Sequence, residues 1–120
     1  MSKPRTTDPT ERFFAELAAR GHEPLLRKAS GSMRFDVVDG RQTRRWLVAV
    51  EGGDMAVSRG GGDGSCVVRA DKRVFDKVAS GRLNAVAAVL RGDLQVEGDW
   101  RLLVRMQRLF PGPRRRRATS

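Results

Sequence analysis

The stretch from Asp71 to Phe110 constrains the fold most, because it alternates helical and extended patterns along forty residues. Val74, Phe75 and Val78 follow Asp71 at the spacing of one helix face. The Asp71 carboxylate can accept hydrogen bonds from the free backbone N–H groups of a first turn. This pattern predicts a helix that begins just after Asp71.

A second short helix is predicted to end at Gly92. Its apolar stripe is formed by four residues at positions i, i+3, i+4 and i+7: Leu83, Val86, Ala87 and Leu90. Beyond it, Leu94 and Val96 alternate with polar residues, which indicates a brief strand.

Asp99 is then placed to cap a last helix, which Pro111 ends because proline cannot continue a helix. The residues that share the apolar face of this helix are Leu102, Leu103, Met106, Leu109 and Phe110. The stretch therefore supplies three helices and a strand whose apolar positions face one side.

Four pieces of this stretch occur in a recognisable order: Ser80-Gly81-Arg82-Leu83-Asn84, Ala87-Ala88, Gly92-Asp93-Leu94 and Val96-Glu97-Gly98-Asp99. In order and spacing they resemble the C-terminal half of the sterol carrier protein type-2 domain, a small lipid-binding family. The chain departs from that pattern at Ala85, Val89 and Asp93, where the family commonly has Pro, Phe and Lys. The change from Phe to Val at position 89 alters the shape expected for the family's cavity. The resemblance therefore does not identify the ligand.

The N-terminal part predicts a helix that Asp8-Pro9 starts and whose face carries Phe13, Phe14 and Leu17. Alternating Met33, Phe35 and Val37 then predict a strand.

A turn at Asp39-Gly40 leads into a second strand over residues 43–51, with Trp46 and Val48 on one face. Leu47 and Ala49 make the other face apolar too, which predicts a strand covered on both sides. Strands at residues 55–57 and 65–70 complete four strands in meander order.

The glycine-rich segment Gly60-Gly61-Gly62-Asp63-Gly64 joins the last two of these strands. No Lys-Ser or Lys-Thr pair follows it and it does not open a helix, so it matches neither nucleotide-binding fingerprint. We interpret it as a flexible hairpin connection.

The predicted fold is α+β, with a five-stranded, mainly antiparallel sheet covered by helices. The resemblance implies that sheet and helices enclose an apolar tunnel or cavity for a fatty acyl chain, a sterol or a similar lipid. The residues expected to line it are Phe35, Trp46, Val48, Phe75, Leu83, Val86, Leu90, Leu103, Met106 and Phe110. Taken singly, each of them fits a solid core equally well.

We expect a disordered N-terminus over residues 1–7, one domain over residues 8–112 and a basic disordered tail over residues 113–120. The formal net charge is +10, of which the tail supplies four through Arg114, Arg115, Arg116 and Arg117. The tail is a candidate for transient contact with an anionic membrane surface, because cations concentrate oppositely charged partners. Two alternatives stay open: a module that binds nucleic acid or an acidic partner, and a solvated basic surface.

Catalysis finds little support in the residues. His22, the one histidine, has no acidic or nucleophilic partner in an identifiable motif, and Cys66, the one cysteine, fits a small buried residue of a strand. We therefore expect no metal, no cofactor and no enzymatic activity. The N-terminal residues lack an apolar signal region and no apolar run approaches the roughly 20 residues that span a bilayer, so we expect a cytoplasmic location.

These observations favour a non-catalytic protein that binds, and can transfer, a lipid or another small hydrophobic ligand. A small-molecule enzyme that uses the apolar cavity as its active site remains a further alternative. The oligomeric state stays open.

Overall fold

The computed structural model describes residues 7–110 of the chain. The elements run in the order α1 (Pro9–Arg20), η1 (Pro24–Leu26), β1 (Ser30–Asp39), β2 (Gln42–Glu51), β3 (Asp54–Arg59), β4 (Cys66–Asp71), α2 (Lys72–Ala79), α3 (Ala85–Leu90), β5 (Leu94–Gly98), α4 (Trp100–Met106) and η2 (Gln107–Leu109). The disorder expected at residues 1–7 and 113–120 falls outside the described residues, Thr7 excepted.

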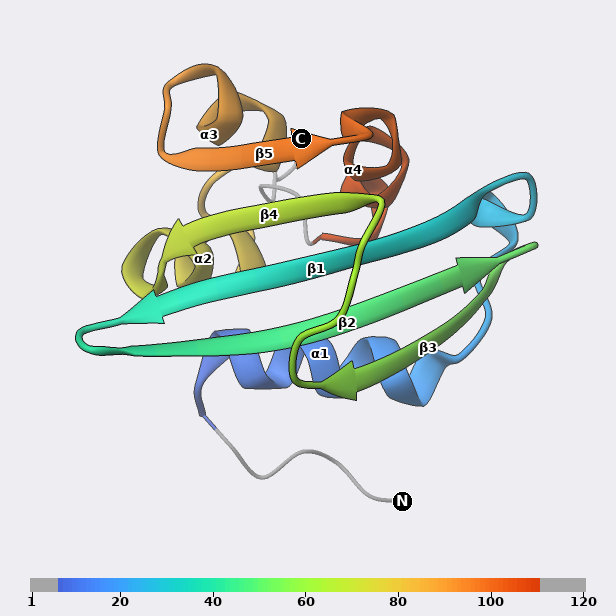
Figure 1. Cartoon of the computed structure of the whole chain (residues 1–120), viewed down its shortest axis with the longest axis horizontal. Coiled ribbons are helices and arrows are strands. Elements are labelled where there is room, and N and C mark those ends of the chain that lie inside the picture. Colours follow the sequence, from blue (N-terminus) through green and yellow to red (C-terminus); the bar gives the residue numbers. More distant parts are fainter. Residues whose placement is uncertain (1–6, 111–120) are drawn as a thin grey trace, which may run out of the picture.

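The five strands form one sheet in the order β3-β2-β1-β4-β5 (Figure 1). Three of the four strand pairs are antiparallel, which confirms the predicted α+β fold with a mainly antiparallel sheet. The predicted meander order is wrong, however, because β4 pairs in parallel with β1 and does not continue from β3. This placement gives the apolar β1 a neighbour on each side, so that Met33 and Phe35 are fully buried.

The glycine-rich segment is a crossover and not the predicted hairpin connection. It leaves β3, passes over one face of the sheet in front of β2 and β1, and enters β4 (Figure 1). A Cβ atom at Gly64 would lie 3.0 Å from the backbone N of Arg34 and 3.0 Å from the carbonyl O of Cys66. Glycine is required there because the connection lies almost in contact with the strands.

The helices cover the other face of the sheet, which we call the inner face. Across it, Trp46 of β2 stands opposite Phe35 of β1, and Phe35 stands opposite Val68 of β4. All three side chains are buried. β2 is not covered on both sides as predicted, because Ala49 is exposed and Leu47 only half-buried on the outer face.

One carboxylate is nevertheless buried on the outer face. Asp36 is 3% exposed because the Arg34 guanidinium covers it, with Nε 3.0 Å from Oδ1 and Nη2 3.1 Å from Oδ2. Arg45 of β2 and Arg69 of β4 approach the same carboxylate from the two neighbouring strands, at 3.4 and 3.8 Å. The outer face therefore carries a compact, fully polar cluster with an excess of positive charge.

The helix starts predicted at Asp8, Asp71 and Asp99 are confirmed by side-chain caps. Asp8 accepts from the backbone N–H of Thr10 at 3.0 Å and begins α1. Asp71, Asn84 and Asp99 cap α2, α3 and α4 in the same way. α4 ends at Met106, earlier than predicted, since the chain tightens into the 3-10 turn η2.

No helix within residues 7–110 is both long enough and apolar enough to cross a membrane.

Candidate functional site

The apolar interior lies between the inner face of the sheet and the helices, and its centre is aromatic. Phe14 of α1 stacks on Trp46 of β2, with ring centroids 4.4 Å apart. Phe75 of α2 lies 5.7 Å from Phe14 and 5.7 Å from Phe35. Contacts of this kind between rings add to the free energy of apolar burial.

Seven of the ten predicted lining residues lie in this interior. They are the buried residues Phe35, Trp46, Val48, Phe75, Leu103, Met106 and Phe110. Two sheet strands, α2, α4 and the segment after η2 thus contribute to one hydrophobic cluster. Their side chains belong to one packed hydrophobic core. Their role as ligand contacts stays a prediction.

The three remaining residues, Leu83, Val86 and Leu90, do not form the predicted stripe. Asn84 caps α3 by accepting from the N–H of Ala87 at 3.0 Å, so that Leu83 precedes the helix. Spacing counted from Leu83 therefore does not describe one helix face. Leu83 and Val86 are half-buried, and Leu90 is 82% exposed.

The inner face of α3 consists of small side chains instead. Ala85 is 1% exposed and Ala88 is fully buried. Alanine lets a helix backbone approach the core closely, while the larger Leu83 and Val89 stay half-buried and pack against the core beside it. The stretch from Ala85 to Ala88 thus closes the interior with little side-chain volume.

Sequence reasoning left Phe13 and Phe14 out of the expected site, although both lie in the interior. Phe13 stacks on Phe110 with centroids 4.5 Å apart and an interplanar angle of 6°. The adjacent aromatic pair in an amphipathic helix was the signal that could have placed them there.

Gln107, at the start of η2, was also missed. Its side-chain oxygen Oε1 is buried and has no hydrogen-bond partner among the described residues. Leaving a buried acceptor unpaired costs about 1–3 kcal/mol. A hydroxyl or a protonated carboxyl group of a ligand is the kind of donor that would satisfy it.

Three of the four α-helices that residues 7–110 form over this interior are short. α2, α3 and α4 have 8, 6 and 7 residues. Isolated helices shorter than about 12 residues are marginal in water, so these depend on their packing against the sheet.

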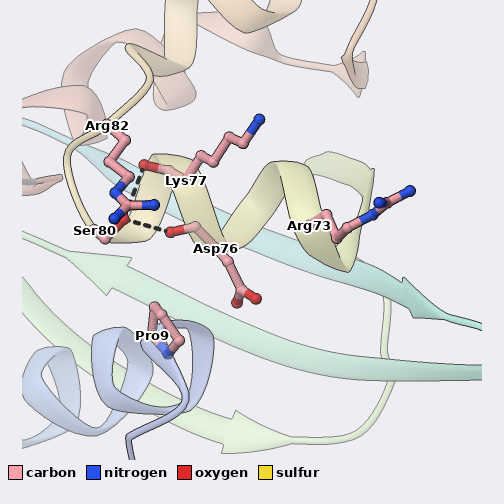
Figure 2. Close-up of a pocket in the computed structure, with 6 residues that line it drawn as sticks. All are labelled: Pro9, Arg73, Asp76, Lys77, Ser80 and Arg82. Atoms are coloured by element: carbon pink, nitrogen blue, oxygen red, sulfur yellow. Dashed lines mark hydrogen bonds between the residues drawn. The ribbon is translucent and has the colours of Figure 1, made fainter.

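A separate hollow of about 390 Å³ lies at the surface along α2, beside the start of α1 (Figure 2). Arg73, Lys77 and Arg82 line it, and the Ser80 hydroxyl donates to the carbonyl oxygens of Asp76 and Lys77. The three cations can attract an anionic group, but their side chains are exposed and water screens the attraction.

The Asp76 carboxylate in this hollow is already engaged. It accepts from the Thr10 hydroxyl at 2.7 Å and from Lys72 Nζ at 2.9 Å. Lys72 also lies 3.1 Å from Asp8 Oδ2, the N-cap of α1. Burial raises the pKa of Asp8, but the hydrogen bond from Lys72 and those from the backbone of Glu11 and Thr10 outweigh it and lower that pKa. The polar cluster of Asp8, Thr10, Lys72 and Asp76 therefore joins α1 to α2.

Cys66 is fully buried in β4, as predicted. Burial, with the nearby Asp99 carboxylate, raises the pKa of its thiol to about 11. The side chain is thus a small apolar residue and not a nucleophile at neutral pH.

His22 has an acidic partner that no sequence motif marks. Its Nδ1 lies 2.7 Å from Oδ1 of Asp54, and both side chains are largely exposed. Sequence spacing could not show this pair because thirty-two residues separate its members. Within residues 7–110, no three His, Cys, Asp or Glu side chains lie close enough together to hold a metal ion.

The sequence model of the SCP-2 sterol transfer family matches residues 11–111, which is most of the chain. The chain belongs to the SCP-2 sterol transfer family. The SCP-2 match extends over most of the N-terminal helix and over the sheet, as well as over the C-terminal half that carries the four resembling pieces of sequence.

Solved structures with the SCP-2 fold are similar over nearly the whole chain. The sterol carrier protein domain 2 of Helicoverpa armigera is 21% identical, with a TM-score of 0.71, 99% of this chain and 100% of that chain covered. The apo form of sterol carrier protein 2 from Yarrowia lipolytica is 17% identical, with a TM-score of 0.70 and coverage of 92% and 95%. These similarities confirm the fold.

The Aedes aegypti sterol carrier protein-2, solved in complex with the C16 fatty acid palmitate, is 15% identical. Its TM-score is 0.69, with 88% of this chain and 96% of that chain covered. No curated protein matches this chain.

Proposed function

We propose that this SCP-2 protein binds one lipid molecule, an acyl chain or a sterol, in the apolar interior between the inner face of the sheet and the short helices. The observation that carries the proposal is the structure of this interior: seven apolar side chains converge between the sheet and the helices, and three of those helices, α2, α3 and α4, have only 6 to 8 residues. Membership of the sterol transfer family and the palmitate complex of the Aedes aegypti protein support it.

The ligand enters by displacing the C-terminal roof, which consists of α4, η2 and Phe110. Leu103 and Met106 of α4 are buried against the core, so that moving α4 outward frees apolar surface for the ligand. The cost of moving α4 outward is the same for every ligand, whereas each methylene of the acyl chain that is then buried contributes about 0.8 kcal/mol. Met106 adapts to ligands of different shape because its side chain is unbranched and flexible.

The Gln107 amide oxygen receives the polar end of the ligand. It is the buried acceptor that the described residues leave without a partner, and it directly follows Met106 in the chain. A ligand that donates one hydrogen bond is thereby preferred over a pure hydrocarbon of equal size.

An environment-sensitive apolar dye tests the proposal. We expect saturable binding with one dye per chain and displacement by fatty acids or sterols. Met106→Trp should weaken binding by filling the interior, whereas Leu90→Trp, at an exposed position, should leave it unchanged. Extraction of the native protein with organic solvent, followed by mass spectrometry, identifies the lipid that co-purifies. Dye binding that no lipid displaces would refute the proposal.

We place the protein in the cytoplasm and propose that the tail cations Arg114, Arg115, Arg116 and Arg117 contact anionic membranes during lipid uptake. Each basic residue near such a surface contributes about 1 kcal/mol. Deleting residues 113–120 should weaken binding to anionic vesicles and leave dye affinity unchanged. A loss of affinity for duplex DNA with a flatter salt dependence would instead support the nucleic-acid alternative.

The protein acts without catalysis in this proposal, and the exposed pair of His22 and Asp54 only joins the end of α1 to β3. His22→Ala should therefore leave every acyl thioester and ester as stable as it is with the unaltered protein. Turnover that disappears in this variant would assign an enzymatic role to the pair.

A further inference from the structure

α4 has two apolar sides, and only one of them is covered. Leu102, Leu103 and Met106 face the interior and are buried. Trp100 and Val104, one helical turn apart, are 60% and 42% exposed. Few large apolar side chains of residues 7–110 are exposed at all. The occurrence of two of them, Trp100 and Val104, on one face of one short helix therefore needs an explanation.

Cations lie beside this exposed pair. Arg101 and Arg105 follow Trp100 and Val104 by one position each, and both are exposed. Together with Lys28 they line a shallow hollow of about 170 Å³ that also contains Asp99. Since Asp99 is paired with Arg101 at 3.1 Å, the hollow keeps an excess of positive charge.

The 3-10 helix η1 packs against α4. There, Leu25 is 54% exposed. We call the surface formed by Leu25, Lys28, Trp100, Arg101, Val104 and Arg105 the α4 surface. It combines an amphipathic aromatic ring, two aliphatic side chains and three cations.

We propose that the α4 surface docks the protein on an anionic lipid membrane, with Trp100 and Val104 inserted at the level of the headgroups. Trp is favoured at the boundary between headgroups and acyl chains, because its ring is apolar and its N–H is polar. Arg101 and Arg105 can extend their stems along the apolar layer while their guanidinium groups pair with lipid phosphates. The net charge of +10 on the whole chain draws it to such a surface.

The size of the α4 surface favours lipid over a protein partner. A stable protein interface buries about 800 Å² on each side and involves about 20 to 30 residues. The α4 surface offers three large apolar side chains with cations beside them, which suits shallow insertion into a bilayer.

Docking in this orientation places α4 between the bilayer and the apolar interior. Its outer face then contacts headgroups, while its inner face covers the space assigned to the lipid ligand. This consequence rests on the proposed function, but docking itself does not, because vesicle binding and ligand binding are measured separately.

The test uses the full chain and vesicles of phosphatidylcholine with and without phosphatidylserine. Trp100→Ala/Val104→Ala should lower the partition onto anionic vesicles about tenfold or more, since burying a large apolar side chain contributes about 1.5–3 kcal/mol. Leu90→Ala is the matched control, because Leu90 is exposed on α3 at the opposite end of β5 (Figure 1). It should leave the partition unchanged.

A second pair of variants separates position from total charge. Arg101→Ala/Arg105→Ala should lower the partition about thirtyfold, at about 1 kcal/mol for each cation. Arg41→Ala/Arg73→Ala removes the same charge from two exposed positions on the β1–β2 turn and on α2, away from α4. Its effect should be much smaller. Equal losses in the two pairs would overturn the proposal in favour of non-specific attraction.

Tryptophan fluorescence reports the docked residue directly. The chain has two tryptophans, Trp46 at 2% exposure and Trp100 at 60%. Lipids brominated in the upper acyl chain should quench the emission of Trp100 and leave that of Trp46, so Trp100→Phe should abolish the quenching. Quenching that persists in Trp100→Phe, or a concentration-dependent dimer that Trp100→Ala abolishes without vesicles, would overturn the assignment. Dye affinity in solution is measured separately for each of these variants, and a change there without a change in vesicle partition would bear on the proposed function and not on docking.

Discussion

The ring of Phe110 lies stacked on the ring of Phe13, with centroids 4.5 Å apart and an angle of 6° between the planes. This contact joins the last described residue to the first helix and closes the apolar interior. A ligand that enters under the C-terminal roof must separate the two rings. Their separation is therefore the structural event on which the lipid-binding proposal depends.

Phe110→Ala is predicted to destabilise the protein and to favour ligand binding at the same time. Phe110 is 7% exposed, and truncation of a buried Phe typically costs about 3–5 kcal/mol of unfolding free energy. Because the vacated volume no longer needs to be cleared, apolar dye affinity should rise. Denaturant unfolding and dye titration measure the two effects. A fall in dye affinity would show that Phe110 holds the ligand and does not compete with it.

Gln107→Met is predicted to stabilise the free protein and to weaken its preference for ligands with a hydroxyl group. The variant removes a buried acceptor that lacks a partner, which recovers about 1 kcal/mol or more of unfolding free energy. The ratio of affinities for a long-chain alcohol and its parent hydrocarbon should fall. An unchanged ratio would place the polar end of the ligand elsewhere.

Asp8 gives the protein an acid-sensitive contribution to stability. Although burial raises its pKa, the hydrogen bonds from Lys72, Glu11 and Thr10 bring the pKa below its ordinary value. A carboxyl whose pKa is lower in the folded state stabilises the fold above the unfolded pKa of about 3.9 and loses this effect as pH falls through the folded value. Unfolding free energy should therefore drop more steeply below about pH 4 in the protein than in Asp8→Asn. Asn is suitable because it caps helices as well as Asp does.

Cys66 should resist thiol reagents in the native state. The side chain is fully buried and its thiol pKa is raised to about 11, so very little thiolate is present at neutral pH. A chromogenic disulfide added at pH 8 should react in denaturant and not in buffer. Rapid reaction in buffer would contradict this, because it would mean that β4 or the segments packed on it frequently open and expose the Cys66 thiol.

Local patterns predicted the elements well. Asp8, Asp71 and Asp99 mark helix starts in the sequence, and all three accept backbone hydrogen bonds in the structure. Alternation in β1 placed Phe35 on the inner face, where it is buried. Caps and alternation depend on residues close in sequence, and they are readable for that reason.

Long-range arrangement was not readable in the same way. The parallel pairing of β4 with β1 follows from where the glycine-rich segment crosses the sheet, and a run of glycines is equally compatible with a hairpin. The α3 stripe failed because Asn84 starts the helix one residue after Leu83, which shifts the buried face to Ala85 and Ala88. Neither the stack of Phe13 on Phe110 nor the pair of His22 and Asp54 leaves a local signal, since contact between distant residues depends on the topology.

Binding of a series of saturated fatty acids, measured by titration calorimetry, tests the central claim most directly. If the acyl chain is buried in the interior, each added methylene contributes about 0.8 kcal/mol, so the dissociation constant should fall about fourfold per methylene until the chain outgrows the available space. One molecule should bind per chain, with a negative heat-capacity change. Weak, non-saturable binding that does not depend on chain length would contradict the account.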